Sequence, residues 1–410
     1  MKRVSSRVFS ALLLAALLVS TLGSSLQTSV LTKSVATIPV EVPSYGLLFL
    51  QARVNGSGPM SFVLDTGAGF PFILDARRAS SLGLQLRDRV TQGGGAGAGS
   101  YEVAYSSGLS FNLGSLTFEN QQAAVIALHS LETLAGRPFD GIVGSNLFAH
   151  YVVEIDYAKQ KVTLYDPQTY RYSGSGESLP LITRNNYIFV NAIVEALDGR
   201  KLNGRFLIDT GGGFVSAILN TPFAAANHFP APSQKSVSDR AFAGLGGETA
   251  LLITRARSFL LGSFVIQEPV IYVSQDKGGA LSVSNYDGVI GAGVLGKFKL
   301  IFDAPHRRLI LEPNARFPER IEYDMSGVRF RAGGENLRTF TAYQVLENSP
   351  AAEAGLRKGD VLAEFDGQTA SGFTLDQIYQ LLQQPGREYK LIVNRDGAAL
   401  SMKLKTRQLI

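Results

Sequence analysis

Short apolar runs separated by turn residues make up most of this chain. Runs of about four to eight residues rich in Val, Ile, Leu and Phe alternate with Gly, Pro, Asn and Asp, which is the pattern of short strands joined by turns. Weaker helical patches are predicted near residues 76–82, 131–134 and 145–150. The pattern therefore predicts a mainly β protein.

An internal repeat organises these runs. Residues 62–70 read FVLDTGAGF and residues 206–214 read FLIDTGGGF. Three further blocks recur: a Leu-Gly-Ser at 113 and 261, an Asp-Gly followed by two apolar residues and Gly at 140 and 287, and an apolar strand that ends in Asp156 or Asp303. The copies lie 144 to 148 residues apart in all four cases. One register over four blocks predicts two similar lobes, at residues 38–172 and 178–317.

The repeated Asp-Thr-Gly points to acid–base chemistry. In each copy the Asp follows an apolar run, and Gly67 or Gly211 then permits a tight turn and a close backbone approach. A lone buried carboxylate is costly, but two carboxyls brought together by a pseudo-two-fold axis can share one proton. One of them can then act as a base toward a water while the other polarises a carbonyl group.

These motifs resemble the pepsin and retropepsin superfamily of aspartic peptidases, whose dyad is a standard case of proton sharing. The resemblance implies a bilobal fold with Asp65 and Asp209 as catalytic residues. It also implies that Thr66, Gly67, Thr210 and Gly211 support the catalytic turns, the two threonines by hydrogen bonds to the opposite turn. Because both copies lie in one chain, dimerisation is not required for the site.

Two features of the repeat need separate mention. Ala68 and Gly212 stand where pepsin-like enzymes carry a hydroxyl beside the aspartate, which favours a bacterial retropepsin-like branch and leaves acid-pH behaviour open. The Gly-rich segments 92–100 and 242–248 lie where the family places flaps over the cleft. The alternative is that both are plain surface loops.

From about residue 323 the pattern changes, and residues 323–410 resemble bacterial PDZ domains, which are α+β modules. The resemblance rests on Ser349-Pro-Ala-Ala-Glu-Ala-Gly-Leu356, the Lys-Gly-Asp at 358–360 and the Asp-Gly at 366–367, with a helix predicted at 374–382 and a strand at 389–395. PDZ domains bind peptide C-termini or strands beside a helix, with backbone amides of a loop on the terminal carboxylate. The loop here would comprise Gly327, Val328, Arg329 and Phe330.

Composition excludes several classes of function. The net charge of +5 is spread along the chain without a basic block, so no nucleic-acid partner is expected. The chain has no Cys, which excludes disulfides and thiol catalysis, and its four His residues are far apart, so neither a metal nor a cofactor is expected.

The N-terminus has the order of a secretory signal peptide. Lys2, Arg3 and Arg7 precede an apolar run at 11–19, followed by small and polar residues to position 25. We therefore expect residues 1–25 to be a signal peptide and the protein to be exported, to the periplasm or outside the cell. The alternative is an uncleaved anchor, which alone would place the protein at a membrane.

Together these features predict an aspartic endopeptidase that acts on polypeptide substrates, with peptide or substrate recognition by the PDZ domain. The alternative is a catalytically inactive peptide-binding or scaffold protein on the same fold. A serine hydrolase is not supported, because no Gly-x-Ser-x-Gly elbow or credible Ser/His/Asp set is present.

Overall fold

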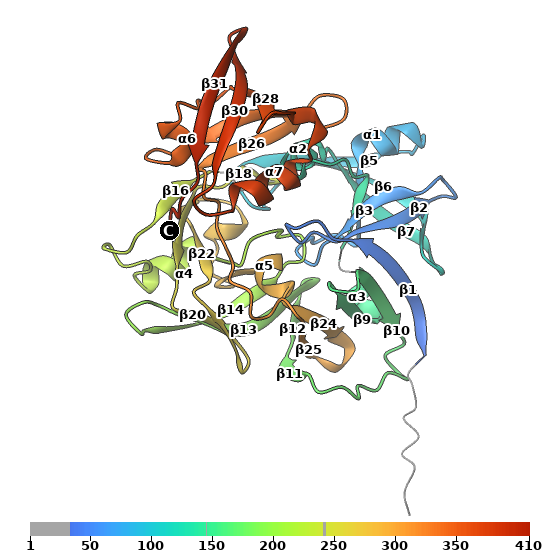
Figure 1. Ribbon diagram of the computed structural model, residues 1–410. Coiled ribbons are helices and arrows are strands. Elements are labelled where there is room, and N and C mark those ends of the chain that lie inside the picture. Colours follow the sequence, from blue (N-terminus) through green and yellow to red (C-terminus); the bar gives the residue numbers. More distant parts are fainter. Residues whose placement is uncertain (1–32, 145, 241–242) are drawn as a thin grey trace, which may run out of the picture. The chain divides into compact units, whose positions relative to one another are not determined.

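The computed structural model describes residues 33–144, 146–240 and 243–410 (Figure 1). The fold is mainly β, as predicted. The expected signal peptide at 1–25 and Phe242 of the second Gly-rich segment lie outside the described residues. Within the described ranges, none of the helices has the length and apolarity needed to cross a membrane.

A 13-stranded sheet contains the strands of the first copy together with β11, β24 and β25, which follow the first copy in the chain. Its order is β11-β25-β24-β9-β10-β1-β2-β3-β8-β4-β7-β6-β5. The strands are β1 (Ser34–Glu41), β2 (Phe49–Val54), β3 (Met60–Leu64), β4 (Phe72–Asp75), β5 (Arg87–Gly93), β6 (Ser100–Leu113), β7 (Leu116–Ile126), β8 (Gly141–Val143), β9 (Val152–Asp156), β10 (Lys161–Tyr165), β11 (Glu177–Pro180), β24 (Phe298–Asp303) and β25 (Arg308–Pro313).

The remaining strands of the second copy form a 10-stranded sheet, ordered β16-β19-β22-β15-β23-β14-β13-β20-β21 with β12 beside β13. Its strands are β12 (Ile182–Arg184), β13 (Tyr187–Glu195), β14 (Lys201–Ile208), β15 (Ala217–Leu219), β16 (Val237–Asp239), β19 (Leu251–Arg255), β20 (Ser258–Leu261), β21 (Phe264–Gln267), β22 (Val270–Ser274) and β23 (Gly288–Ile290). A separate hairpin consists of β17 (Ala243–Gly244) and β18 (Gly247–Glu248).

The two copies share one topology and meet at equivalent residues. β3 pairs in parallel with β8, and β14 pairs in parallel with β23, with Phe62 opposite Gly141 and Phe206 opposite Gly288. The copies join where β9 pairs with β24, and Glu154 lies opposite Ile301, its own counterpart in the repeat. This self-matched pairing indicates a pseudo-two-fold axis, and it explains why strands from both predicted lobes share the larger sheet.

Short helices connect these strands, and helices form at the patches predicted near 76–82, 131–134 and 145–150, the first of them ending at Ser81. Asp75 begins the first helix, because its carboxylate accepts the Arg77 N–H at the N-cap. The helices are α1 (Ala76–Ser81), α2 (His129–Ala135), α3 (Asn146–His150), α4 (Thr221–Ala226), α5 (Ala292–Leu295), and the 3₁₀ turns η1 (Ala280–Ser282) and η2 (Ala304–His306).

The C-terminal region has its own sheet and core. Phe330, Phe340 and Phe365 are buried in a cluster separate from those of the two copies. Thr374 and Gln377 form a capping box that begins α7. The elements are β26 (Val328–Gly333), β27 (Thr339–Val345), β28 (Val361–Phe365), β29 (Gln368–Thr369), β30 (Glu388–Arg395), β31 (Ala398–Lys405), α6 (Pro350–Glu353), α7 (Leu375–Leu382) and η3 (Ala370–Gly372).

Candidate active site

The two Asp-Thr-Gly turns lie against each other at the ends of β3 and β14. The Thr66 N–H donates to Thr210 Oγ1 at 3.1 Å, and the Thr210 N–H donates to Thr66 Oγ1 at 3.0 Å. Each hydroxyl then donates to the opposite strand, Thr66 to the Ile208 carbonyl at 2.7 Å and Thr210 to the Leu64 carbonyl at 2.8 Å. Both threonines are buried, so four otherwise unpaired polar groups satisfy one another across the pseudo-axis. This is the arrangement that the resemblance implied for Thr66 and Thr210.

The glycines of the turns provide the space in which the two carboxyls meet. A Cβ on Gly67 would lie 2.6 Å from Cγ of Asp209, and a Cβ on Gly211 would collide with the carboxyl of Asp65. No side chain larger than hydrogen fits at either position without moving the opposite aspartate. Each glycine therefore lies against the other lobe's carboxyl.

Burial and mutual contact shift the pKa values of both aspartates. Burial raises the pKa of Asp65, partly offset by hydrogen bonds from Asp209 and from backbone amides. Burial, the charge of Asp65 and a hydrogen bond to it raise the pKa of Asp209 well above its ordinary value. The two carboxyls therefore favour a state in which they share one proton.

Backbone amides support the carboxylates where no neighbouring hydroxyl is present. The Gly67 N–H donates to Asp65 Oδ1 at 2.7 Å, and the Gly211 N–H donates to Asp209 Oδ1 at 2.9 Å. Ala68 and Gly212 therefore leave a site in which main-chain donors hold both carboxyls. The positions of these amides are set by the backbone geometry of the turns and do not depend on a neighbouring side chain.

Tyr187 is a residue of the site that sequence reasoning missed. It begins β13, and a Cβ on Gly69 would lie 2.5 Å from its hydroxyl oxygen. Burial raises the pKa of Tyr187, and the charges of Asp65 and Asp209 add to the effect, so the phenol lies beside the dyad in its neutral form. The strand registers make Tyr187 the counterpart of Leu47. The difference between Tyr187 and Leu47 is the feature of the sequence that could have indicated this residue.

The two Gly-rich segments form hairpin turns that contact each other. β5 and β6 pair around residues 94–99, and β17 pairs with β18. The Gly99 N–H donates to the Gly246 carbonyl at 2.8 Å, and the Gly246 N–H donates to the Ala96 carbonyl at 3.0 Å. Ala96 packs against a hydrophobic cluster of the second copy that includes Tyr187, and Leu245 packs against one of the first copy that includes Ala68. Each tip thus reaches over to the opposite lobe.

A cavity of about 350 Å³ joins the dyad to the C-terminal region. It reaches Asp65 and Gly211 at one end and Phe330, Leu375 and Tyr379 at the other. The sequence provided no reason to place the last three beside the catalytic turns. Within the described ranges, no group of three or more His, Asp or Glu side chains is placed to hold a metal ion.

The four residues expected to bind a peptide terminus are already engaged within the chain. The Gly327 N–H donates to Asp324 Oδ2 at 2.6 Å, and the Val328 N–H donates to Ser326 Oγ at 3.2 Å. The hydroxyl of Tyr379 accepts the Phe330 N–H at 2.9 Å and donates to the Phe330 carbonyl at 3.0 Å.

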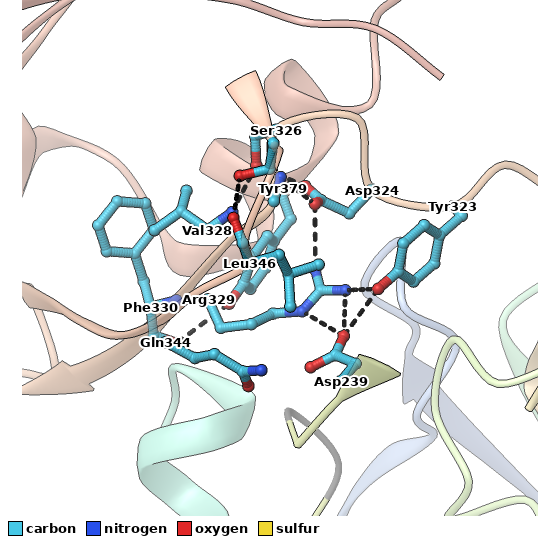
Figure 2. A network of polar contacts seen from close by, with 12 residues as sticks. Asp239, Tyr323, Asp324, Ser326, Val328, Arg329, Phe330, Gln344, Leu346 and Tyr379 are labelled. Atoms are coloured by element: carbon cyan, nitrogen blue, oxygen red, sulfur yellow. Dashed lines mark hydrogen bonds and ion pairs between the residues drawn. The ribbon is translucent and has the colours of Figure 1, made fainter. Parts of the chain in front are cut away.

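Arg329 differs most from expectation, because its side chain is buried against Asp239 of the second copy (Figure 2). The guanidinium of Arg329, in the loop expected to bind a peptide terminus, is therefore occupied by an internal carboxylate in this arrangement.

Comparisons with known proteins agree with the predicted resemblance. Residues 50–147 match the family model described as aspartyl protease, and residues 341–395 match a PDZ domain model. No curated protein matches the sequence. Among solved structures, the aspartic proteinase from Irpex lacteus is similar at 17% sequence identity and a TM-score of 0.45, covering 70% of this chain and 99% of that chain. Residues 50–147 are therefore similar to aspartyl proteases, and residues 341–395 are similar to PDZ domains.

Proposed function

We propose that this protein is an aspartic endopeptidase that hydrolyses peptide bonds with a water activated between Asp65 and Asp209. The observation that carries the proposal is the pair of partly buried carboxyls that share a hydrogen bond between two threonine-linked turns. A binding protein has no need of two adjacent acids with raised pKa values, whereas acid–base hydrolysis depends on them. Polypeptides are the proposed substrates.

In this proposal Asp65 is the ionised partner, Asp209 is the protonated partner, and each has its own role. Ionised Asp65 takes a proton from water as its oxygen attacks the carbonyl carbon, while Asp209 donates its proton to the carbonyl oxygen. The resulting gem-diol collapses when the C–N bond breaks. The leaving nitrogen then receives the proton from Asp65, and a diol hydroxyl returns one to Asp209. The dyad is thus restored without a covalent intermediate.

Replacement of each aspartate by asparagine tests this function. Asp65→Asn and Asp209→Asn should each lower kcat on a denatured protein, such as carboxymethylated lysozyme, by about 10³-fold. Circular dichroism should show a retained fold, because the amide has the shape of the carboxyl. The matched control is Asp198→Asn at an exposed ion pair with Arg200, where turnover should stay at the wild-type level. Wild-type turnover in either dyad variant would refute the assignment.

Two further parts of the proposal, export and peptide recognition, come from the sequence. Export to the periplasm or outside the cell is proposed from residues 1–25. Peptide recognition by the PDZ domain is supported by the family match at 341–395. Because Asp324 and Tyr379 engage the donors of the expected loop, such a peptide would have to displace them.

A further inference from the structure

The PDZ domain is attached to the β17–β18 hairpin, whose tip contacts the first lobe beside Ala68. Figure 2 shows the guanidinium of Arg329 between Asp239, Tyr323 and Asp324. Arg329 binds Asp239 Oδ2 through Nε at 3.0 Å and through Nη2 at 2.7 Å, and the Tyr323 hydroxyl donates to the same oxygen at 2.7 Å. Asp239 ends β16, four residues before β17 begins. The network therefore joins β26 to the base of the second hairpin.

Two more contacts reach the same hairpin. Arg331, two residues along β26, forms an ion pair with Glu248 in β18 at 2.7 Å. The Arg240 N–H donates to the side-chain oxygen of Gln344 in β27 at 3.1 Å. The PDZ domain thus holds this hairpin both before β17 and at the end of β18.

The free edge of β26, where a PDZ domain adds a peptide strand, is covered by the first lobe. β26 is the terminal strand of its sheet, and α2 lies against it. Gly136, which follows α2, lies so close to α7 that a Cβ on it would be 2.5 Å from Cβ of Leu375. The Ser44 N–H also donates to Asp376 in α7 at 3.2 Å. The domain therefore contacts the lobes on both sides of the dyad.

The segment that leads into the PDZ domain is fixed to the second lobe. The Lys297 ammonium donates to the carbonyls of Arg316 and Phe317 at 3.0 and 3.3 Å, and Arg255 donates to the carbonyl of Ile321 at 3.0 Å. Leu409, near the C-terminus, is buried in a cluster with Tyr272 of the second lobe. The domain is thus held at its beginning and at its end.

Closure of the hairpin limits access to the dyad. The cavity of about 350 Å³ is near the lower end of the size range of small-molecule sites, roughly 300–1,000 Å³. While the hairpin tips are bonded to each other, they connect the two lobes beside Ala68 and Tyr187. The contacts from the PDZ domain to the hairpin and its base are ion pairs and a hydrogen bond, and their polar groups regain water when they separate.

We propose that the PDZ domain is an autoinhibitory latch, which holds the β17–β18 hairpin closed over Asp65 and Asp209 through Arg329–Asp239 and Arg331–Glu248. The proposal rests on the proposed peptidase function, because it describes regulation of that site. Asp324 keeps the peptide loop filled in this latched state. Substrate enters when β26 and the hairpin separate.

A reversible cross-link tests the latch. The chain contains no Cys, so Glu248→Cys with Arg331→Cys can be bridged selectively by a bis-methanethiosulfonate reagent and released with dithiothreitol. The matched control is Glu388→Cys with Lys403→Cys, an exposed ion pair within the PDZ hairpin, linked in the same way. Turnover of carboxymethylated lysozyme and hydrogen exchange of the Gly99 and Gly246 amides are measured on full-length protein.

Linking positions 248 and 331 should lower turnover by at least about tenfold, slow exchange at both amides, and reverse with dithiothreitol. Glu248→Lys, which places two cations together, should speed exchange at Gly246. Unchanged exchange and turnover on linking, or an equal effect of the 388–403 link, would overturn the latch. Slower exchange in a protein that cleaves nothing even when released would keep the latch and refute the proposed peptidase function.

Discussion

The aspartate dyad and the Arg329 network are both clusters of charged groups with limited access to solvent, the first partly buried and the second buried, and they differ in what compensates the charge. Asp65 and Asp209 have each other and backbone amides, but no cation contacts them among the hydrogen bonds and ion pairs of the described residues. Asp239 has a bidentate guanidinium and a phenol, and Asp324 lies 3.5 Å from the same Arg329. The first cluster therefore retains a proton, whereas the second is a set of paired charges.

The comparison shows that the burial of charged groups serves two purposes in this chain. Where burial leaves a carboxyl without a cation, its pKa rises and it can hold a proton for transfer at a pH at which an exposed carboxyl is ionised. Where burial encloses a complete ion pair, the groups hold two domains together and take no part in chemistry. The following predictions test this contrast, from the largest expected effect to the smallest.

Removal of the cation alone should be the most damaging change. Arg329→Met leaves the carboxylates of Asp239 and Asp324 buried without their cation, so the free energy of unfolding should fall by about 3–5 kcal/mol. Urea denaturation at pH 7 measures the loss. Arg331→Met, at a partly exposed position on the same strand, is the control and should change stability by less than about 1 kcal/mol. Similar small losses in both variants would contradict the contrast.

Removal of one threonine hydroxyl should cost less. Thr66→Val keeps the shape of the side chain but leaves the Thr210 N–H and the Ile208 carbonyl without their partner. We expect a loss of about 1–3 kcal/mol in stability, with a fall in kcat as the turns separate. Thr66→Ser restores the hydroxyl and should recover most of both. A valine variant with wild-type stability would mean that the linked turns contribute little.

The dyad should make stability fall as pH rises. Because the pKa values of Asp65 and Asp209 are raised in the folded state, folded protein keeps a proton that the unfolded chain releases above about pH 4. Stability from this source is present at low pH and is lost as pH increases through the folded-state pKa. Asp209→Asn should remove most of that slope. Thermal melts of wild type and variant between pH 4 and pH 8 measure the difference, and parallel curves would contradict the shift.

The exposed contact of the latch should scarcely affect global stability. Glu248→Gln removes a charge from an ion pair with Arg331 that is 39% and 47% exposed on its two sides, so the loss should be within about 0.5 kcal/mol. Glu388→Gln serves as the control and should behave alike. A loss near that of Arg329→Met would mean that exposed and buried ion pairs are equivalent here.

Much of the architecture was predictable because its signals are local. The repeated Asp-Thr-Gly motifs, their apolar strands and their common spacing predicted the two copies and the pairing of Asp65 with Asp209. The Ser-Pro-Ala and Lys-Gly-Asp signatures predicted the PDZ domain, and the cap at Thr374 is readable from a few residues. Such features depend on residues that are close together in the sequence, so the sequence pattern predicts them.

Tertiary structure alone decided the partners of the PDZ loop and the surroundings of the dyad. Arg329 lies 90 residues from Asp239, and no spacing or periodicity indicates that they meet. From the sequence, Arg329 was expected to face a peptide, because a sequence pattern does not show whether an arginine side chain is buried against an internal carboxylate. Tyr187 came beside the dyad through strand register, and Tyr379 came to line the same cavity through domain packing. The sequence therefore determined which groups can do the chemistry, and long-range contacts determined which charges are left uncompensated to do it.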